Sequence, residues 1–230
     1  MQMIMWLISC IPLVGTAVVL LFMPDRVPMH YDITGTVDRW GSKYEELIFP
    51  VVILVFCLFF TLLIRYYKKH AQNAVNDRKK AAAMANVKIF QITGICMAAA
   101  FTILQGFLLN SACRAAMTGA EHEEPDLLRV VCIILGALYI ILGYLMPKTS
   151  INRIFGVRVK WSMYNDVTWS RSNQFGSYVM IAAGIISIIC ACIIPGSTAA
   201  LITVAAVLIA ASAVILIYAH HIYKKEISKA

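Results

Sequence analysis

A stretch without any charged side chain covers residues 172–219, and this stretch most limits what the chain can fold into. A helix needs about 20 apolar residues to cross about 30 Å of hydrocarbon, so the stretch is too long for one membrane span. Pro195, Gly196 and Ser197 interrupt it, and proline and glycine are typical of a turn. The stretch therefore predicts two spanning helices that are joined by a short turn.

Six segments of suitable length and polarity occur in the 230-residue chain, in which 60% of the residues are hydrophobic and 14% are charged. This composition excludes an ordinary soluble domain. We expect an all-α membrane protein with six transmembrane helices, a structured extracytoplasmic loop after the first helix and a cytoplasmic loop before the fifth. The predicted spans are residues 3–23, 47–64, 89–110, 130–146, 177–194 and 198–219.

Basic residues gather in the segments after the second, fourth and sixth spans, whereas the segment after the third span is acidic. Since Lys and Arg favour the cytoplasmic side of a membrane, both termini are expected in the cytoplasm. Topology and contact with membrane lipids then explain the net charge of +8, and we expect no direct binding of nucleic acid.

No charged side chain lies inside a predicted span, which argues against an ion-coupled pump. Polar residues of the third span, including Thr102 and Gln105, are expected to form hydrogen bonds between helices, and Gln105 is also the candidate lining residue of a transporter. The seven cysteines have no metal-ligand spacing. The cysteines therefore predict no metal site, and we assign no cofactor and no catalytic residue.

The first polar segment, residues 24–43, separates the first two spans. Residues 27–32 and 36–40 are rich in strand-forming side chains and flank a turn at Gly35, so they predict a small hairpin.

Three roles are open for His30 and Asp38 of this hairpin: a metal site, ion pairs that hold the hairpin closed, or recognition of a ligand outside the cell. Trp40 is expected at the membrane interface, which aromatic residues of this kind favour.

The second polar segment, residues 152–176, precedes the fifth span. Ser162 or Asn165 is expected to cap the helix that leads into this span, because a short polar side chain can bond free backbone amides. Three residues of that helix share a face through their i, i+4, i+7 spacing: Trp169, Asn173 and Gly176. The composition alone would also suit an amphipathic segment that its Trp and Arg residues anchor at the membrane surface.

Together the two polar segments resemble the SdpI family, the membrane immunity proteins of the sporulation-delaying toxin system of Gram-positive bacteria. The inner segment matches the family motif at Asn152, Gly156, Val157, Arg158, Trp161, Ser162, Asn165 and Trp169. The outer segment resembles a domain of unknown function that often precedes it, at Pro24, Pro28, His30, Gly35, Asp38, Gly41, Ser42 and Lys43. The chain departs from the family at Val159, where Thr is common, and at Asn173, where His is common.

The resemblance divides the chain into an N-terminal domain (1–65, with the motif loop 24–43), a basic cytoplasmic loop (66–88) and an SdpI-like domain (89–230, with the motif loop 147–176). The candidate site residues of the outer loop are Pro28, His30, Gly35, Asp38, Trp40, Gly41, Ser42 and Lys43. Those of the inner loop are Asn152, Gly156, Arg158, Trp161 and Trp169.

The resemblance also implies a protein of the bacterial cytoplasmic membrane that protects the cell against a secreted antimicrobial peptide. It further implies sequestration of a cytoplasmic repressor, which a basic inner surface with exposed tryptophans would hold. Two alternatives are an enzyme with a polar site at the headgroups, built on His30 and Asp38 or on Asn152 and Arg158, and a transporter of peptide or lipid.

Overall fold

The computed structural model describes residues 1–32, 36–119 and 126–229, which contain six long helices and one two-stranded antiparallel sheet. The helices are α1 (Gln2–Val19), α2 (Ile48–Gln72), α3 (Asp77–Thr118), α4 (Asp126–Leu145), α5 (Asp166–Ile193) and α6 (Ser197–Ile227). The sheet pairs β1 (Arg26–Tyr31) with β2 (Val37–Ser42). Two short 3-10 helices, η1 (Lys43–Leu47) and η2 (Met146–Lys148), precede α2 and follow α4.

Each of the six long helices is long and apolar enough to cross a membrane, which confirms the predicted number of spans. Helices satisfy their own backbone hydrogen bonds, so they are the form in which this chain can cross hydrocarbon. Large apolar side chains cover their outward faces, among them Leu7, Ile193 and Ile217. The protein is therefore a multi-pass membrane protein whose helices contact lipid.

Several helices are longer than the predicted spans. The basic segment 66–88, expected as a loop, is mostly helical, because α2 continues to Gln72 and α3 already begins at Asp77. Asn76 caps α3 by accepting a hydrogen bond from the backbone amide of Lys79 at 2.9 Å. Lys, Arg and Ala are good helix formers, so the helices persist where the sequence becomes polar. The predicted turn at Pro195 is confirmed, with Gly196 at a positive φ of 84°.

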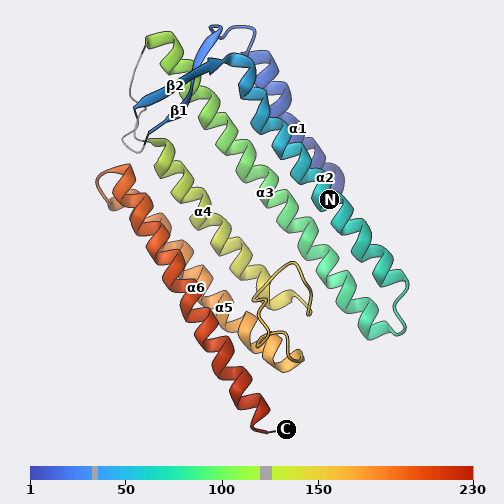
Figure 1. The fold of residues 1–230 in the computed structure, drawn as a ribbon. Helices are drawn as coiled ribbons and strands as arrows, with labels where there is room; N and C mark the ends of the chain where they lie inside the picture. Colours follow the sequence, from blue (N-terminus) through green and yellow to red (C-terminus); the bar gives the residue numbers. More distant parts are fainter. Residues whose placement is uncertain (33–35, 120–125, 230) are drawn as a thin grey trace.

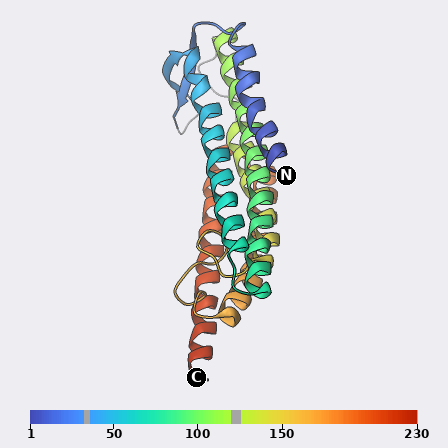
Figure 2. The same cartoon turned by 90° about the vertical axis from the view of Figure 1, so that its right-hand side faces the viewer.

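The helices form two halves that lie side by side, α1 to α3 in one and α4 to α6 in the other, and the halves meet along α3 and α4 (Figure 1). The strand pair lies at one end of the elongated bundle, and the irregular segment between α4 and α5 lies toward the other end (Figure 2). The two polar segments that the sequence singled out are thus separated by the length of the spans.

Contacts between helices use small residues and a few hydrogen bonds, as is common inside membranes. Gly136 of α4 and Gly184 of α5 face each other so closely that a Cβ atom at Gly184 would lie 2.5 Å from the Gly136 carbonyl oxygen. In the other half, Gln105 Nε2 donates to Thr16 Oγ1 at 3.1 Å, and Thr102 Oγ1 donates to the Ile8 carbonyl at 3.2 Å. These bonds confirm the predicted interhelical role of Thr102 and Gln105.

Candidate functional site

The outer polar segment folds into the predicted hairpin, and β2 extends through Gly41 and Ser42. The register pairs Pro28 with Trp40 and His30 with Arg39, and it is irregular on both sides of His30. Gly35, the predicted turn residue, lies outside the described residues. We use the name hairpin below for the described part of residues 24–47.

His30 and Asp38 meet across the hairpin, with 2.6 Å between His30 Nδ1 and Asp38 Oδ1. Their side chains are 65% and 46% exposed, so the pair contributes at most about 1 kcal/mol to stability. The described part of the chain holds no cluster of three His, Cys, Asp or Glu side chains that could bind a metal ion. The geometry is that of a surface hydrogen bond or ion pair, which links the two strands.

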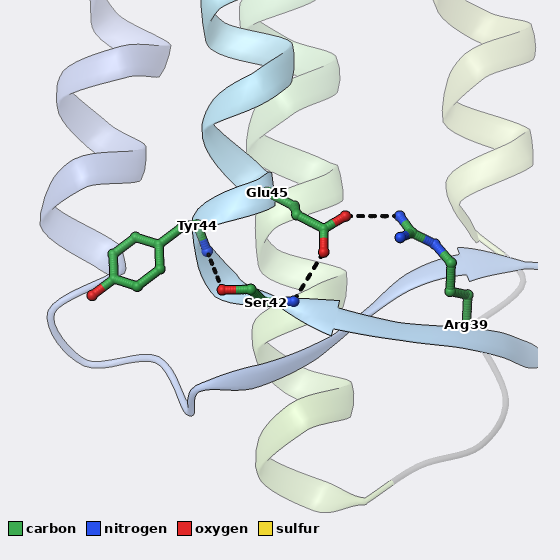
Figure 3. Close-up of polar contacts among 4 residues, drawn as sticks. All are labelled: Arg39, Ser42, Tyr44 and Glu45. Atoms are coloured by element: carbon green, nitrogen blue, oxygen red, sulfur yellow. Dashed lines mark hydrogen bonds and ion pairs between the residues drawn. The ribbon is translucent and has the colours of Figure 1, made fainter.

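Glu45 closes the hairpin onto η1, as Figure 3 shows. One carboxylate oxygen accepts the Ser42 backbone N–H at 3.0 Å, and the other accepts a hydrogen bond from Arg39 Nη2 at 3.0 Å. Ser42 Oγ in turn accepts the Tyr44 backbone N–H at 3.4 Å. The Ser42 amide, and then Arg39, hold the pKa of Glu45 below its usual value. The sequence analysis missed Glu45, although Ser-x-x-Glu is the spacing of a capping box.

Gly41 and Lys43 connect this arrangement to the rest of the molecule. A side chain at position 41 would collide with the Glu45 carboxylate and with Met29, so only glycine fits there. Lys43 Nζ donates to the Met23 carbonyl at 3.1 Å and lies 3.1 Å from Asp25 Oδ1. Because the side chain of Lys43 is largely buried (14% exposed), it anchors the hairpin to the end of α1. Both residues therefore support the shape of the hairpin.

The second polar segment forms an irregular loop between α4 and α5, which we call the motif loop (residues 146–165). Asn152 organises its first half. The Oδ1 atom of Asn152 accepts the backbone N–H groups of Ile154 and Phe155 at 2.8 and 2.7 Å, and its Nδ2 donates to the carbonyls of Ser150 and Phe155. Since the buried side chain uses both its donor and its acceptor atoms in this way, Asn152 determines the path of the loop.

Trp169 and Asn173 of α5 pack against Gly156 at the centre of the motif loop. Gly156 has a φ of 102°, and a Cβ atom there would collide with Asn173 Oδ1. Asn173 Oδ1 accepts the Val157 N–H at 2.9 Å, and Asn173 Nδ2 donates to the Trp169 carbonyl at 2.9 Å. The i, i+4, i+7 spacing had placed Asn173 beside Trp169, but its bond to the loop was not predicted.

The expectation that the tryptophans of this segment lie at the surface is wrong for Trp169, which is only 3% exposed. Its indole N–H donates to the Thr149 carbonyl at 2.9 Å. A buried carbonyl without a partner is costly, so this bond favours an inward-facing Trp169 over a membrane anchor.

The second half of the loop is held by short polar side chains. Asn165 is the helix cap of α5, in a reciprocal pair with Thr168 at 2.8 and 3.0 Å. Ser162, the other predicted cap, instead donates to the Val157 carbonyl at 2.6 Å and accepts the Val159 N–H. Ser162 therefore closes a turn within the loop, because its hydroxyl bonds backbone groups of residues that precede it in the chain.

Arg158 and Trp161 are the two inner-motif residues on the outside of the loop. Arg158 is exposed and donates to the Arg153 carbonyl. Trp161 packs edge-on against His220 of α6, with 4.4 Å between ring centroids. Arg158 is therefore available at the surface and Trp161 is half-buried, whereas Asn152, Gly156 and Trp169 are structural.

A groove of about 660 Å³ separates the motif loop from the ends of α2 and α3; we call it the inner groove. Lys79 and Arg153 contribute its charged side chains, His70 adds an imidazole, and no carboxylate among the described residues lines it. Asn86 of α3 joins the two walls by accepting the Ser150 N–H at 3.1 Å. With several basic groups and aromatic walls, the inner groove can bind an anionic group.

Comparison with known proteins agrees with this arrangement. Residues 148–219 match the SdpI/YfhL protein family. This part of the chain is similar to the family. Residues 7–64 match a domain of unknown function, DUF1648. The first match contains almost all of the motif loop, and the second contains the hairpin. The resemblance inferred from the two polar segments is therefore confirmed.

One curated relative of this chain is the immunity protein SdpI of Bacillus subtilis (strain 168). The two chains are 22% identical over 220 residues, which cover 95% of this chain and 94% of the relative. No solved structure matches the chain.

Proposed function

We propose that this protein is an immunity protein of the bacterial cytoplasmic membrane, which protects the cell against a secreted antimicrobial peptide. The observation that carries the proposal is the similarity to immunity protein SdpI along almost the whole chain, hairpin and motif loop included. In this proposal the hairpin faces outward and meets the peptide, while the motif loop and both termini lie in the cytoplasm.

The distribution of charge supports this orientation. Basic residues concentrate at the motif-loop end of the bundle, where the ends of α2 and α3 carry Arg65, Lys68, Lys69, Arg78, Lys79 and Lys80. Positive charge near the ends of spans favours the cytoplasmic side. The hairpin end is then the outer one.

The exposed face of the hairpin supports a role in recognition. His30 and Trp40 present exposed side chains, whereas Gly41, Ser42 and Lys43 shape the hairpin beneath them. An aromatic ring with polar groups beside it is typical of binding surfaces. We therefore assign the recognition of the peptide to His30 and Trp40, and we assign no catalytic role to the pair of His30 and Asp38.

The inner groove supports a second part of the proposal, the retention of a cytoplasmic repressor. Its basic groups would bind an acidic segment of that partner, and Arg158 and Trp161 would extend the contact surface. Since Trp169 is buried, the surface tryptophan in this role is Trp161 alone.

A protection assay tests the proposal. Cells of Bacillus subtilis that lack their own SdpI would express this chain and be challenged with the secreted peptide to which that loss makes them sensitive. We expect wild-type protein to restore growth, and we expect the double variant His30→Ala/Trp40→Ala to lose protection while it accumulates in the membrane at the same level. Tyr178→Ala, which removes an exposed aromatic ring from α5, is the matched control and should protect fully. Unchanged sensitivity with wild-type protein would contradict the proposal.

The inner groove needs a separate experiment. Lys79→Glu/Arg153→Glu should abolish copurification of an acidic cytoplasmic partner without loss of protection, because the two substitutions reverse charges on the wall of the groove. Lys224→Glu/Lys225→Glu at the end of α6 removes the same number of positive charges and should have no effect. Equal loss of copurification in both variants would show a general effect of charge and would contradict specific binding in the inner groove.

A further inference from the structure

A cavity of about 700 Å³ lies where the two halves of the bundle meet, apart from both the hairpin and the inner groove. Side chains of α3, α4 and α5 line it. Most of its lining is aliphatic and includes Ile92, Ile141 and Ile181. The remaining side chains are Lys88, Tyr144 and Lys148. A volume of this size is typical of a pocket for a small molecule or for part of a larger apolar one.

The polar side chains of the cavity lie toward its motif-loop end. Lys88 precedes Ile92 by one turn of α3, and Lys148 follows Ile141 by about two turns of α4 and η2. Because α3 and α4 run in opposite directions, both lysines lie on the same side of the isoleucines (Figure 1). The cavity thus has an apolar part and a cationic end.

The charges at this end have no partner of opposite sign within the described chain. Lys148 Nζ lies 3.3 Å from the centre of the Tyr144 ring, and Lys88 and Lys148 are both exposed. No carboxylate lines the cavity among the residues that the structure describes. An anion at this position would therefore meet two ammonium groups and no repulsion.

Packing of α1 against α3 shows that Lys88 lies at the boundary of the hydrocarbon. Met5 of α1 packs against Gly94, so the start of α1, which runs parallel to α3, lies close to the level of Lys88. At the other end, Leu20 packs with Leu109. Between Lys88 and Leu109, α3 rises about 30 Å, which equals the thickness of the hydrocarbon core. The aliphatic part of the cavity is therefore inside the hydrocarbon, and the lysines are at headgroup level.

We propose that this cavity binds one anionic phospholipid, with the phosphate between Lys88 and Lys148 and an acyl chain along the isoleucines of α3, α4 and α5. A soluble anion would use the lysines and leave the aliphatic walls uncovered. A zwitterionic lipid offers the same phosphate but brings its own ammonium group, so an anionic headgroup is favoured. The site adds to the proposed immunity function and does not depend on it.

The test measures lipid binding to the purified full-length protein, with phosphatidylglycerol and phosphatidylcholine of identical acyl chains added to delipidated samples and bound lipid counted by native mass spectrometry. We expect one tightly held phosphatidylglycerol, bound about tenfold more tightly than phosphatidylcholine. Lys88→Gln/Lys148→Gln should remove this preference. Lys224→Gln/Lys225→Gln removes two exposed lysines of α6 and should bind lipid as the wild type does.

A second variant tests the aliphatic part of the cavity. Ile141→Trp fills the space between α3 and α4 with a larger side chain, so it should lower the binding of both lipids by about tenfold while the lysines remain. Thermal unfolding of every variant checks that the fold is intact.

Three results would overturn the proposal: equal binding of the two lipids by the wild type, unchanged preference in Lys88→Gln/Lys148→Gln, or displacement of the lipid by millimolar inorganic phosphate. The last result would assign the lysines to a soluble anion. None of these measurements involves the secreted peptide, so failure here leaves the protection assay unaffected.

Discussion

At the scale of single residues, Gly156 is restricted both by its backbone conformation and by the space around it. Its φ of 102° is rare for residues with a side chain, and Asn173 Oδ1 occupies the position that a Cβ atom would take. The same Asn173 oxygen accepts the Val157 N–H, so it cannot move away without leaving a buried amide unpaired.

Gly156→Ala should therefore lower the free energy of unfolding by about 2 kcal/mol or more, as the sum of backbone strain and displacement of Asn173. Thermal unfolding of the purified protein in detergent measures the effect. Gly119→Ala is the matched control, because Gly119 also has a positive φ (67°) but nothing lies within 4 Å of a Cβ atom there. It should cost about 1 kcal/mol, the strain alone. Equal losses in the two variants would show that Asn173 does not restrict position 156.

Glu45 makes the hairpin sensitive to acid. Because the folded state holds the pKa of Glu45 below its usual value, its contribution is complete above the ordinary carboxyl pKa. That contribution is lost as the pH falls through the lower, folded pKa. The protection factor of the Ser42 amide against hydrogen exchange, taken relative to an unprotected amide at the same pH, should therefore stay high down to the ordinary carboxyl pKa. It should fall at pH values below that pKa. Glu45→Gln keeps an acceptor but cannot titrate, so the protection factor of the Ser42 amide in this variant should not vary over the same pH range. The same pH dependence as in the wild type would contradict the role of Glu45.

At the scale of elements, α4 and α5 make close contact at a pair of glycines. Gly136 and Gly184 oppose each other there, and their carbonyls lie where side chains would be. Since lipid provides no hydrophobic force between helices, close packing of this kind stabilises the pair. The crossing also supports the motif loop, which connects these two helices.

Gly184→Val should destabilise the protein by about 1–3 kcal/mol through overpacking at this crossing. Gly106→Val on α3 introduces the same side chain where nothing lies within 4 Å of a Cβ atom, and it should be nearly neutral. Thermal unfolding of both variants in one detergent distinguishes the two cases. A large loss in Gly106→Val would point to helix propensity as the cause, in place of packing.

At the scale of the whole molecule, the hairpin and the motif loop lie toward opposite ends of the bundle (Figure 2). A peptide outside and a partner inside could each bind a preformed surface. Communication between the two surfaces would pass through the interface of α3 and α4, where the cavity proposed to bind a lipid also lies.

The proposed sidedness predicts opposite labelling of the two ends. In a background without native cysteines, Tyr44→Cys beside the hairpin should react with a membrane-impermeant maleimide on intact cells. Lys160→Cys in the motif loop should react only after permeabilisation. Both positions are exposed on the protein, so a difference in labelling would report the side of the membrane and not burial of the cysteine. Labelling in the reverse order would overturn the orientation.

Local signals in the sequence were enough to predict the six spans, the turn at Pro195, the hairpin and the Asn165 cap, because hydropathy, turn residues and capping depend on neighbours along the chain. The burial of Trp169, the helical ends of α2 and α3 and the cavity between the halves were decided only in three dimensions. Each depends on groups that are distant in sequence or on a balance between helix propensity and polarity. A pattern of residue types does not show which of these groups come into contact. The packing of the helices decides this, because it sets the distances between groups that are far apart along the chain.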